Sequence, residues 1–564
     1  MTHFSLLRLP YFWDEAGYYV PAARDLMLTG DPVPQSTLSN AHPPLPMAYL
    51  ALWWKVGGFH PSITRIAMLL VAALALLEVF RLARRVAHLQ VAIAAVVCTA
   101  LYPVFFAQSS LAHADLPAAA LTLLGMRMYA GGRRWPATLA FALASLAKET
   151  AIVAPLALAA WETLWLLFGA RTPALWRSVS PVFPRGARDA WLGVLALSFS
   201  MLPLAVWFPY HFWRTGYMFG NPEFFRYNVT ATLDPARILL AAGVRLWQTL
   251  GYMNMFVLTL AAAAAMVLSP QPLGHKFSGP TEVRDSAGDR GHAHPRRGRI
   301  DLRIQAAFLV VILGYIAMLS VIGGAVLARY LLPVAPLYII IAVSTIWRRI
   351  PSWKVPTGLP GRWLRIHGWM VVIGFVSGAF IAGLVINPPY HFAPEDNLTY
   401  RDYILLHQHA AALIQRGYPR ARVLTAWPAT DELNKPYLGY VTSPVTVSPV
   451  ENFSVGEIAK AAEKRRAGSG DYELALVFST KYEPPRMVFP MSLWLSAGTR
   501  YFNYHHDVSA EQAAASLGGH IVMQERRRGE WVALIEFPET QGFQDAQNIP
   551  AAPHPIPRHS ARNK

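Results

Sequence analysis

Residues 304–346 read IQAAFLVVILGYIAMLSVI, GGA and VLARYLLPVAPLYIIIAVSTI, and this stretch decides the fold class. Its two apolar runs, 304–322 and 326–346, each approach the roughly 20 residues with which a helix crosses a bilayer. Eight more apolar runs lie at 62–80, 91–107, 116–130, 136–147, 150–168, 190–210, 238–268 and 368–387. The run at 136–147 is short, which indicates a broken or partial span. The pattern predicts a polytopic α-helical membrane protein with about ten spans.

Composition agrees with this class and locates the charge. Of 564 residues, 54% are hydrophobic and only 15% are charged, too apolar for an ordinary soluble domain of this length. The net charge of +17 comes from residues 1–389, which hold 32 Lys and Arg against 15 Asp and Glu, whereas residues 390–564 hold 18 of each. A basic nucleic-acid-binding domain is therefore not indicated. The solitary Cys98 excludes an intramolecular disulfide.

Positive charges fall in alternate loops, which predicts the orientation. The basic loops contain Arg81, Arg84 and Arg85; Arg133 and Arg134; and segments 171–188, 276–303 and 348–365. By the positive-inside rule these loops are cytoplasmic. We expect a multi-pass protein of the cell (inner) membrane whose first 60 residues, the segment around His113, segment 211–237 and the C-terminal domain lie outside. No span precedes residues 14–15, so either an upstream helix is missing from this start site or the N-terminus crosses unaided.

The predicted domains follow from these runs. Residues 1–60 form an outer loop with a juxtamembrane helix, 61–389 the multi-span domain, 390–538 an extracytoplasmic α+β domain and 539–564 a disordered tail. Within the α+β domain, patterning predicts a helix at 400–415, strands at 422–427 and 474–479 and a hairpin at 521–537 around Arg528-Gly529. The Gly, Pro and Arg content of 269–299 indicates a mobile linker.

Two acidic sites occur in the outer segments. Asp14 and Glu15 stand in the sequence WDEAGYY, where adjacent carboxylates beside aromatic rings suit a general base or an electrostatic clamp. The alternative is a helix N-cap before residues 16–28, a common position for Asp. Asp115 stands in His113-Ala-Asp-Leu-Pro at the mouth of a span, and it too has a helix cap as its alternative.

Candidate phosphate-binding groups stand at the same outer edge. His42 precedes Pro-Pro-Leu-Pro, so it either binds phosphate, orients a carboxylate or simply belongs to a rigid turn. Lys148 stands next to Glu149 between two spans, where it pairs with an anionic headgroup or with Glu149. Arg329-Tyr330 opens a later span; a forked guanidinium contact with phosphate and interfacial anchoring both explain this dipeptide.

The outer loop at 212–228 combines aromatic and polar residues. Arg214, Arg226 and Asn228 accompany several Phe, Tyr and Trp side chains, a composition suited to stacking on sugars or to an interfacial belt. The sequence has no Gly-x-Gly-x-x-Gly, P-loop, His-Glu-x-x-His or Asp-x-Asp motif. A soluble nucleotide-activated donor is therefore disfavoured, and a membrane-borne donor fits better.

The order of these motifs along the chain resembles the membrane glycosyltransferases of the C fold. It is most similar to relatives of the protein O-mannosyltransferases and lipid A aminoarabinose transferases, over residues 11 to about 345. The resemblance implies transfer of a sugar from a polyprenyl-phosphate donor, usually with inversion, to an acceptor outside the membrane. Two departures are the missing first span and a His-Pro-Pro-Leu motif where the aminoarabinose transferases have Lys-Pro-Pro-Leu.

Site roles follow from this resemblance. It implies that Asp14 is the general base, with Glu15 as its neighbour and Asp115 as the second carboxylate of the cavity. His42, Lys148, Arg329 and Tyr330 would bind the donor phosphate, and the substrate loop would contain Arg214, Arg226 and Asn228. No cofactor is required, and a divalent metal is not indicated by any ligand cluster.

Other functions make different demands on the sequence. A transporter or flippase for lipid-linked sugars needs similar cations but usually has repeats and a midplane site, whereas here the polar groups gather at the outer face. A scaffold protein would leave those groups unexplained. Expected partners are membrane lipids, the polyprenyl-phosphate sugar and a protein, lipid A or cell-wall glycan acceptor. The sugar and the acceptor stay open.

Overall fold

The computed structural model describes residues 3–169, 179–182, 186–268, 301–350, 352–356, 363–468, 470–484 and 491–538. Through its internal contacts the chain divides into two compact units. The first contains Met1–Asp402 and Lys481–His505, and the second contains Tyr403–Thr480 and His506–Lys564. The expected linker at 269–299 and the expected tail at 539–564 lie outside the described residues.

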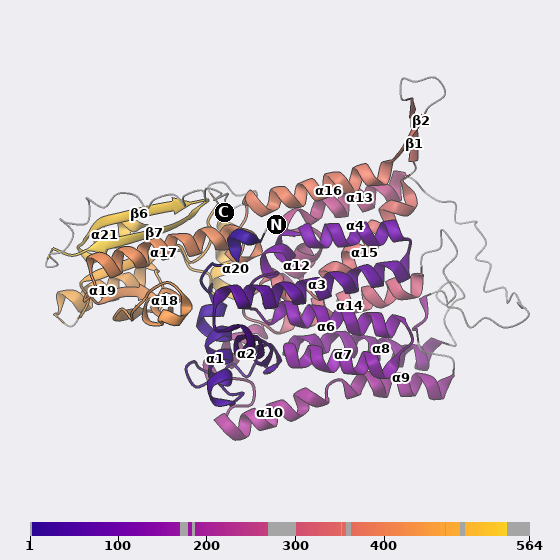
Figure 1. Ribbon diagram of the computed structural model, residues 1–564, viewed down its shortest axis with the longest axis horizontal. Helices are drawn as coiled ribbons and strands as arrows, with labels where there is room; N and C mark the ends of the chain where they lie inside the picture. Colours follow the sequence, from indigo (N-terminus) through magenta and orange to yellow (C-terminus); the bar gives the residue numbers. More distant parts are fainter. Residues whose placement is uncertain are drawn as a thin grey trace, which may run out of the picture. The chain divides into compact units, whose positions relative to one another are not determined.

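The first unit is a bundle of helices lying side by side (Figure 1). Its helices are α1 (Val20–Thr29), α2 (Leu45–Gly57), α3 (Pro61–Val86), α4 (Leu89–Leu101), α5 (Pro103–Gln108), α6 (Asp115–Ala130), α7 (Arg134–Ala147), α8 (Val153–Phe168), α9 (Ala187–Phe199), α10 (Leu202–Thr215), α11 (Pro222–Asn228), α12 (Pro235–Leu250), α13 (Met255–Leu268), α14 (Leu302–Val321), α15 (Ala335–Arg349), α16 (Gly368–Val385) and α20 (Met491–Tyr501). A hairpin of β1 (Ser352–Pro356) and β2 (Trp363–His367) joins α15 to α16.

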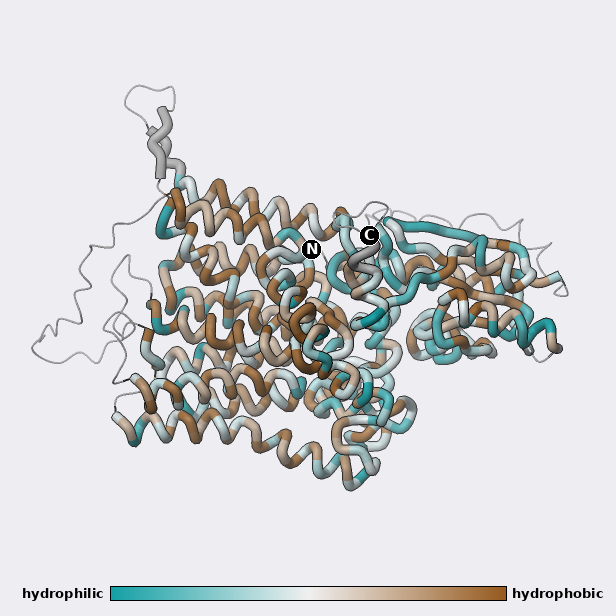
Figure 2. Tube along the Cα trace, turned by 180° about the vertical axis from the view of Figure 1, so that it is seen from behind, coloured by the Kyte–Doolittle hydropathy of each residue, from teal (hydrophilic) through white to brown (hydrophobic). Residues whose placement is uncertain are grey.

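All ten predicted apolar runs form helices, which confirms the polytopic class. Six helical segments of the described chain are long and apolar enough to cross a membrane: Pro61–Val86, Glu149–Phe168, Ala187–Thr215, Pro235–Leu268, Leu302–Val321 and Gly368–Val385. Hydrophobic residues line the helices along their length, and hydrophilic residues gather near the ends (Figure 2). The remaining runs form shorter helices, so a total of ten spans stays a prediction.

Three of the apolar runs are interrupted where the backbone requires it. Pro103 starts α5 after α4 has ended, and a proline near the start of α10 separates it from α9. Between α12 and α13, Met253 and Asn254 have φ angles of 48° and 66°, which a helix cannot contain. The Nδ2 of Asn254 donates to the carbonyl of Ala379 in α16 at 2.7 Å, so the break is fixed by a neighbouring helix.

Small residues bring α6 and α7 close together. Ala118, Ala144 and Ala147 belong to one buried cluster of these helices. A Cβ added at Gly125 would lie only 2.6 Å from the ring of Phe141, so glycine is required for this approach. Small residues allow such close helix contacts within membranes. The antiparallel pair therefore places the start of α6 beside the end of α7.

The second unit contains a five-stranded mixed sheet, which confirms the predicted α+β class. Its strands lie in the order β4-β3-β5-β7-β6, with β3 parallel to β4 and β5 and the other pairs antiparallel. The strands are β3 (Val423–Ala426), β4 (Val447–Val450), β5 (Leu474–Phe478), β6 (His520–Arg527) and β7 (Glu530–Glu536). The helices are most of α17 (Thr399–Gly417), α18 (Ala429–Asn434), α19 (Val455–Arg466) and α21 (Ala510–Leu517).

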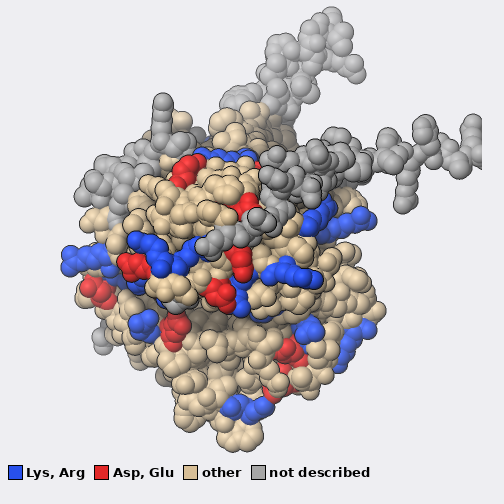
Figure 3. All heavy atoms as spheres, turned by 90° about the vertical axis from the view of Figure 1, so that its left-hand side faces the viewer, with Lys and Arg blue, Asp and Glu red and all other residues tan. Residues whose placement is uncertain are grey.

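The predicted secondary structure of this unit is largely confirmed. The helix at 400–415 corresponds to α17, the strands to β3 and β5, and the hairpin to β6 and β7. The hairpin turns at Arg528 and Gly529, whose φ angles are 47° and 95°, the left-handed pair that a two-residue hairpin needs. Acidic and basic side chains are interspersed on the face drawn in Figure 3. Strand β4 was not predicted, because its sequence includes Pro449.

Candidate functional site

Arg329 lies at the centre of a buried charge cluster in the first unit. It belongs to the 3₁₀ turn Ala328–Leu331 and is only 2% exposed. Its guanidinium forms ion pairs with Asp14, with Glu395 at 2.9 Å and with Asp115 at 3.4 Å. These partners come from three segments far apart in the chain. Three carboxylates around one arginine make a site whose net charge depends on protonation or on a bound ligand.

Asp115 lies between two cations. Its Oδ1 accepts from Lys148 Nζ at 2.5 Å, and its Oδ2 faces Arg329 Nε. The same Nζ lies 3.8 Å from the ring centroid of Tyr330. Asp115 is the first residue of α6 and makes no capping hydrogen bond, so the helix-cap interpretation is wrong. Lys148 follows the last residue of α7, and it pairs with Asp115 rather than with the adjacent Glu149.

Asp14 is the most accessible member of the cluster. Its side chain is 33% exposed, against 2% for the side chains of Arg329 and Asp115. Asp14 stands at the N-cap position of the π-helix Glu15–Tyr19, but its side chain makes no capping hydrogen bond, so capping does not account for its carboxylate. The φ of 47° at Trp13 is unusual for a bulky residue, and such strain clusters at functional sites.

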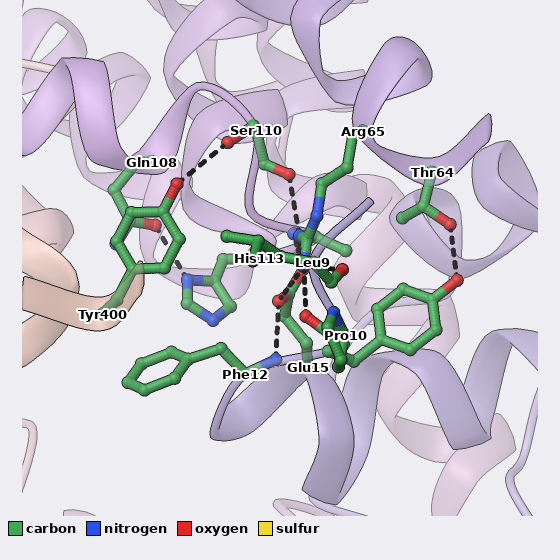
Figure 4. A network of polar contacts seen from close by, with 12 residues as sticks. Leu9, Pro10, Phe12, Glu15, Thr64, Arg65, Gln108, Ser110, His113 and Tyr400 are labelled. Atoms are coloured by element: carbon green, nitrogen blue, oxygen red, sulfur yellow. Dashed lines mark hydrogen bonds and ion pairs between the residues drawn. The ribbon is translucent and has the colours of Figure 1, made fainter. Parts of the chain in front are cut away.

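Glu15 belongs to a separate network that is saturated (Figure 4). It is fully buried, forms an ion pair with Arg65 Nη1, and accepts from Arg65 Nη2 at 3.0 Å. The backbone N–H groups of Phe12 and Ala112 also donate to it, at 2.8 and 2.5 Å. Arg65 in turn donates to backbone carbonyls, among them that of Ser110 at 2.9 Å. These bonds tie the first loop to α3 and to the segment between α5 and α6, as a structural ion pair would.

His42 is held by a carboxylate and by aromatic rings. Its Nδ1 lies 3.1 Å from Glu149 Oε2, and its ring stacks on Tyr19 with centroids 5.7 Å apart. Tyr18 and Phe224 contact the same ring edge-on. Of the three interpretations of His42, the geometry favours the one in which it orients a carboxylate, because its partner here is Glu149.

Glu395 and Asp396 were not identified from the sequence as site residues. Glu395 is 4% exposed and pairs with Arg329, while Asp396 accepts from Tyr252 OH at 2.6 Å. Burial raises the pKa of Glu395 to about 8, reinforced by Asp14 and Asp396 and opposed by Arg329. Burial likewise raises the pKa of Asp396 to about 7. The available signal was an acidic pair that follows the last apolar run after a short segment, 388–394, and is similar to the pair at 14–15.

His113 completes the wall of the cluster. It is buried, and its Nδ1 lies 3.0 Å from Arg329 Nη1 and 2.8 Å from Gln108 Oε1. Burial lowers the pKa of His113 well below its ordinary value, and the charges of Arg329 and Lys148 lower it further. His113 is therefore neutral and adds no positive charge.

Helix α12 holds the segment that leads into Arg329. Arg237 donates to the carbonyl of Gly323 at 2.6 Å, Arg245 to that of Leu327 at 2.7 Å and Gln248 to that of Val326 at 2.7 Å. These donors are spaced by eight and three residues, so they lie on one helix face. Arg245, which sequence reasoning missed inside an apolar run, also lies 5.6 Å from the Tyr330 ring centroid.

The three residues predicted for the substrate loop have different surroundings. Arg214 pairs with Asp31 at 2.6 Å on the surface. Arg226 is exposed. Asn228 accepts from the backbone N–H of Gly324 at 3.1 Å, so it anchors the loop to the segment before Arg329. Among the described residues, none of the predicted three contacts the Arg329 cluster directly through its side chain.

The site thus combines buried cations with a partly exposed carboxylate and with polar atoms that lack hydrogen bonds. Arg329 Nε and Asp115 Oδ2 make no hydrogen bond, and they face each other only as an ion pair at 3.4 Å. Cations of this kind can stabilise an anionic leaving group, and a carboxylate such as Asp14 can accept a proton. In the described part of the chain, no three His, Cys, Asp or Glu side chains are grouped so that they could hold a metal ion.

Comparisons with known proteins identify the fold. No protein-family model matches the chain, and no curated protein matches its sequence. The structure of ArnT, the lipid A aminoarabinose transferase, from Cupriavidus metallidurans bound to undecaprenyl phosphate is similar at a TM-score of 0.50, with 13% identity over 94% of this chain and 95% of that chain. This likeness confirms the expected C-type fold of membrane glycosyltransferases.

A second solved structure is similar at a lower level. The archaeal oligosaccharyltransferase AglB from Archaeoglobus fulgidus, in complex with an inhibitory peptide and a dolichol-phosphate, has a TM-score of 0.41 and 11% identity. The match covers 83% of this chain and 66% of that chain.

Proposed function

We propose that the protein is an integral membrane glycosyltransferase that moves a sugar from a polyprenyl-phosphate donor to an acceptor outside the cytoplasm. The observation that supports this proposal most is the cluster of Arg329, Lys148 and Tyr330 around Asp115, with Asp14 at its accessible edge. The cluster lies in a bundle whose fold matches a transferase crystallised with undecaprenyl phosphate. A transporter is less favoured, because the charged groups join the ends of helices α6 and α7 rather than the middle of the bundle.

The donor phosphate would bind to Arg329 and Lys148. In the phosphodiester donor the phosphate has one negative charge, and it gains a second as the sugar leaves. Cations that meet this growing charge stabilise the transition state more than the ground state. Arg329 Nε is a buried donor that makes no hydrogen bond, and Tyr330 adds a phenol beside Lys148. Protonated Glu395 would reduce the repulsion that the incoming phosphate meets.

Asp14 would act as the general base. Its carboxylate takes the proton of the acceptor hydroxyl or amine while the acceptor atom bonds to the anomeric carbon. The bond from that carbon to the phosphate oxygen breaks at the same time, and the electron pair leaves with polyprenyl phosphate. Attack from the face opposite the leaving group inverts the configuration. The partial exposure of Asp14 supports this role, because an acceptor must reach the base.

The other predicted residues take supporting roles in this proposal. Asp115 positions Lys148 and Arg329, and His42 with Glu149 forms a polar wall next to the phosphate. Glu15 is a structural residue, because both of its oxygens are already occupied. The C-terminal domain and the aromatic loop at 212–228 would face the outside of the inner membrane. The acceptor, a protein, lipid A or a cell-wall glycan, would approach from that side.

Substitution of the base tests the proposal. Asp14→Asn should lower sugar transfer in proteoliposomes supplied with polyprenyl-phosphate sugars by roughly 10²–10⁴-fold, the usual contribution of a general base. The matched control is Asp31→Asn, which changes an acid of the same outer loop that pairs with Arg214, and it should keep full activity. Binding of polyprenyl phosphate should persist in both variants. Unchanged transfer by Asp14→Asn would rule out Asp14 as the base.

A further inference from the structure

A second basic site lies at the opposite ends of the helices that carry the candidate active site. Phe80, Arg81, Arg84 and Arg85 of α3 and Arg127 of α6 line one hollow, here named the arginine hollow. Arg65 and Arg84 are 19 residues apart on α3, which corresponds to roughly 28 Å along the helix. Arg65 pairs with Glu15, and the adjacent Asp14 pairs with Arg329. The separation is close to the thickness of the hydrocarbon layer, so the hollow and the end of α3 next to this loop lie near different membrane surfaces.

One buried carboxylate holds two arginines in the arginine hollow. Glu78 is fully buried, forms an ion pair with Arg127 Nε and lies 3.1 Å from Arg81 Nη1. Each guanidinium keeps further N–H groups beyond these contacts. Glu78 therefore fixes the positions of both side chains without using all of their donors.

The remaining arginines are not neutralised within the described residues. Arg84 and Arg85 are exposed and have no carboxylate partner there. Asp301 lies next to the end of α3, but its carboxylate accepts from the N–H groups of Arg303 and Ile304 and so caps α14. Four arginines against one glutamate leave an excess of three positive charges. An excess of this kind next to a membrane attracts an anionic group.

The exposed surface of α3 indicates what the anionic group is attached to. Ile66, Leu70, Leu74 and Leu77 are exposed and are spaced by four, four and three residues, so they form one apolar stripe along the helix. The stripe leads toward Arg81 and Arg84 in the next turns, and Phe80 adds an aromatic wall to the hollow. An apolar track that ends in a cationic hollow fits a lipid, with acyl chains on the stripe and a phosphate headgroup on the arginines.

We propose that the arginine hollow binds the headgroup of an anionic membrane phospholipid whose acyl chains lie along α3. This site is distinct from the proposed donor site and does not depend on the proposed function. Arginine suits it because a guanidinium makes a forked contact with phosphate. A basic cluster that only directs membrane orientation would need the charges but neither the buried Glu78 nor the adjoining stripe.

Thermal unfolding of the purified full-length protein in detergent tests this proposal. Long-chain phosphatidylglycerol should raise Tm by several degrees more than phosphatidylcholine with the same chains, because a ligand that binds only the folded state stabilises it. Inorganic phosphate and a short-chain phosphatidylglycerol should have much smaller effects. Equal shifts with the two long-chain lipids would overturn the proposal. If inorganic phosphate alone raised Tm as much as long-chain phosphatidylglycerol, the hollow would bind small anions and the lipid proposal would be rejected.

A matched pair of double variants locates the effect. Arg84→Gln with Arg85→Gln should abolish the difference between the two long-chain lipids. Arg348→Gln with Arg349→Gln removes the same charge from the last turn of α15, outside the hollow, and should preserve that difference. Equal loss in both pairs would indicate a diffuse charge effect and reject the site. If the first pair does not fold, Arg84→Lys with Arg85→Lys retains the charge, and it should still reduce the preference for phosphatidylglycerol.

Discussion

Two buried arginines in the first unit show how similar residues acquire different roles. Arg65 faces one carboxylate, that of Glu15, and its remaining hydrogen bonds go to backbone carbonyls. Arg329 faces three carboxylates, and its Nε has no hydrogen bond. The first network has its hydrogen bonds complete, whereas the second keeps a donor, Arg329 Nε, that makes an ion pair but no hydrogen bond, and a partner, Asp14, whose side chain is 33% exposed. Both arginines are buried and charged. What distinguishes the structural pair from the candidate catalytic site is that all hydrogen-bonding groups of the pair are already occupied.

The largest effect is expected from breaking the saturated pair. Glu15→Gln leaves the Arg65 charge buried without its carboxylate, which typically costs about 3–5 kcal/mol. We expect a lower Tm and less folded protein in the membrane, with normal transfer activity per folded molecule. Asp14→Asn, one residue earlier, should show the reverse: near-normal Tm and little activity. If both variants lost activity while Tm stayed unchanged, the assignment of Glu15 to a structural role would be contradicted.

The next largest effect is expected at Arg329, the arginine whose hydrogen-bonding groups are not all occupied. Arg329→Lys keeps the positive charge among Asp14, Asp115 and Glu395 but loses the forked contact with phosphate. We expect transfer to fall by roughly 10²-fold, within the range seen when one donor to a developing anion is removed. The loss should include weaker binding of polyprenyl phosphate, measured by lipid competition. Full activity in Arg329→Lys would show that the guanidinium makes no specific contact with the donor.

A smaller, pH-dependent effect is expected from Glu395. Its raised pKa of about 8 compares with an ordinary value of 4.5, so the folded state retains the proton to higher pH than the unfolded state. Stability from this carboxyl is therefore complete below about pH 4.5 and is lost as pH rises toward 8. Glu395→Gln should reduce the fall of Tm between pH 5 and pH 8, whereas the exposed control Glu223→Gln should not. Parallel Tm profiles for wild type and Glu395→Gln would contradict the raised pKa.

The smallest effect is expected at the surface. Arg214 pairs with Asp31 in an exposed position, and such pairs contribute little. Arg214→Gln should leave Tm and donor binding within error of wild type. A change in the apparent affinity for the acceptor alone would support the predicted substrate loop. A change in donor binding would place Arg214 in the site around Arg329, contrary to the geometry.

Most residues of the candidate site could be predicted from short motifs, but the complete set of residues could not. Asp14, Asp115, Lys148 and Arg329 were recognised because ionisable groups beside apolar runs are rare and need partners. Glu395 was missed, because it follows the last span and was assigned to the soluble domain. The acidic pair at 395–396 was a local signal for a site, but it does not indicate that the chain folds back there toward Arg329.

The sequence by itself determined the membrane class, the α+β nature of the C-terminal part and the outline of the motifs. These follow from apolar length, strand patterning and turn residues, which are properties of contiguous segments. Only the tertiary structure decided that Glu15 closes a structural ion pair while its neighbour Asp14 joins Arg329. The reason is physical: the environment of a charge depends on which distant helices pack around it, and that packing brings together residues 315 positions apart.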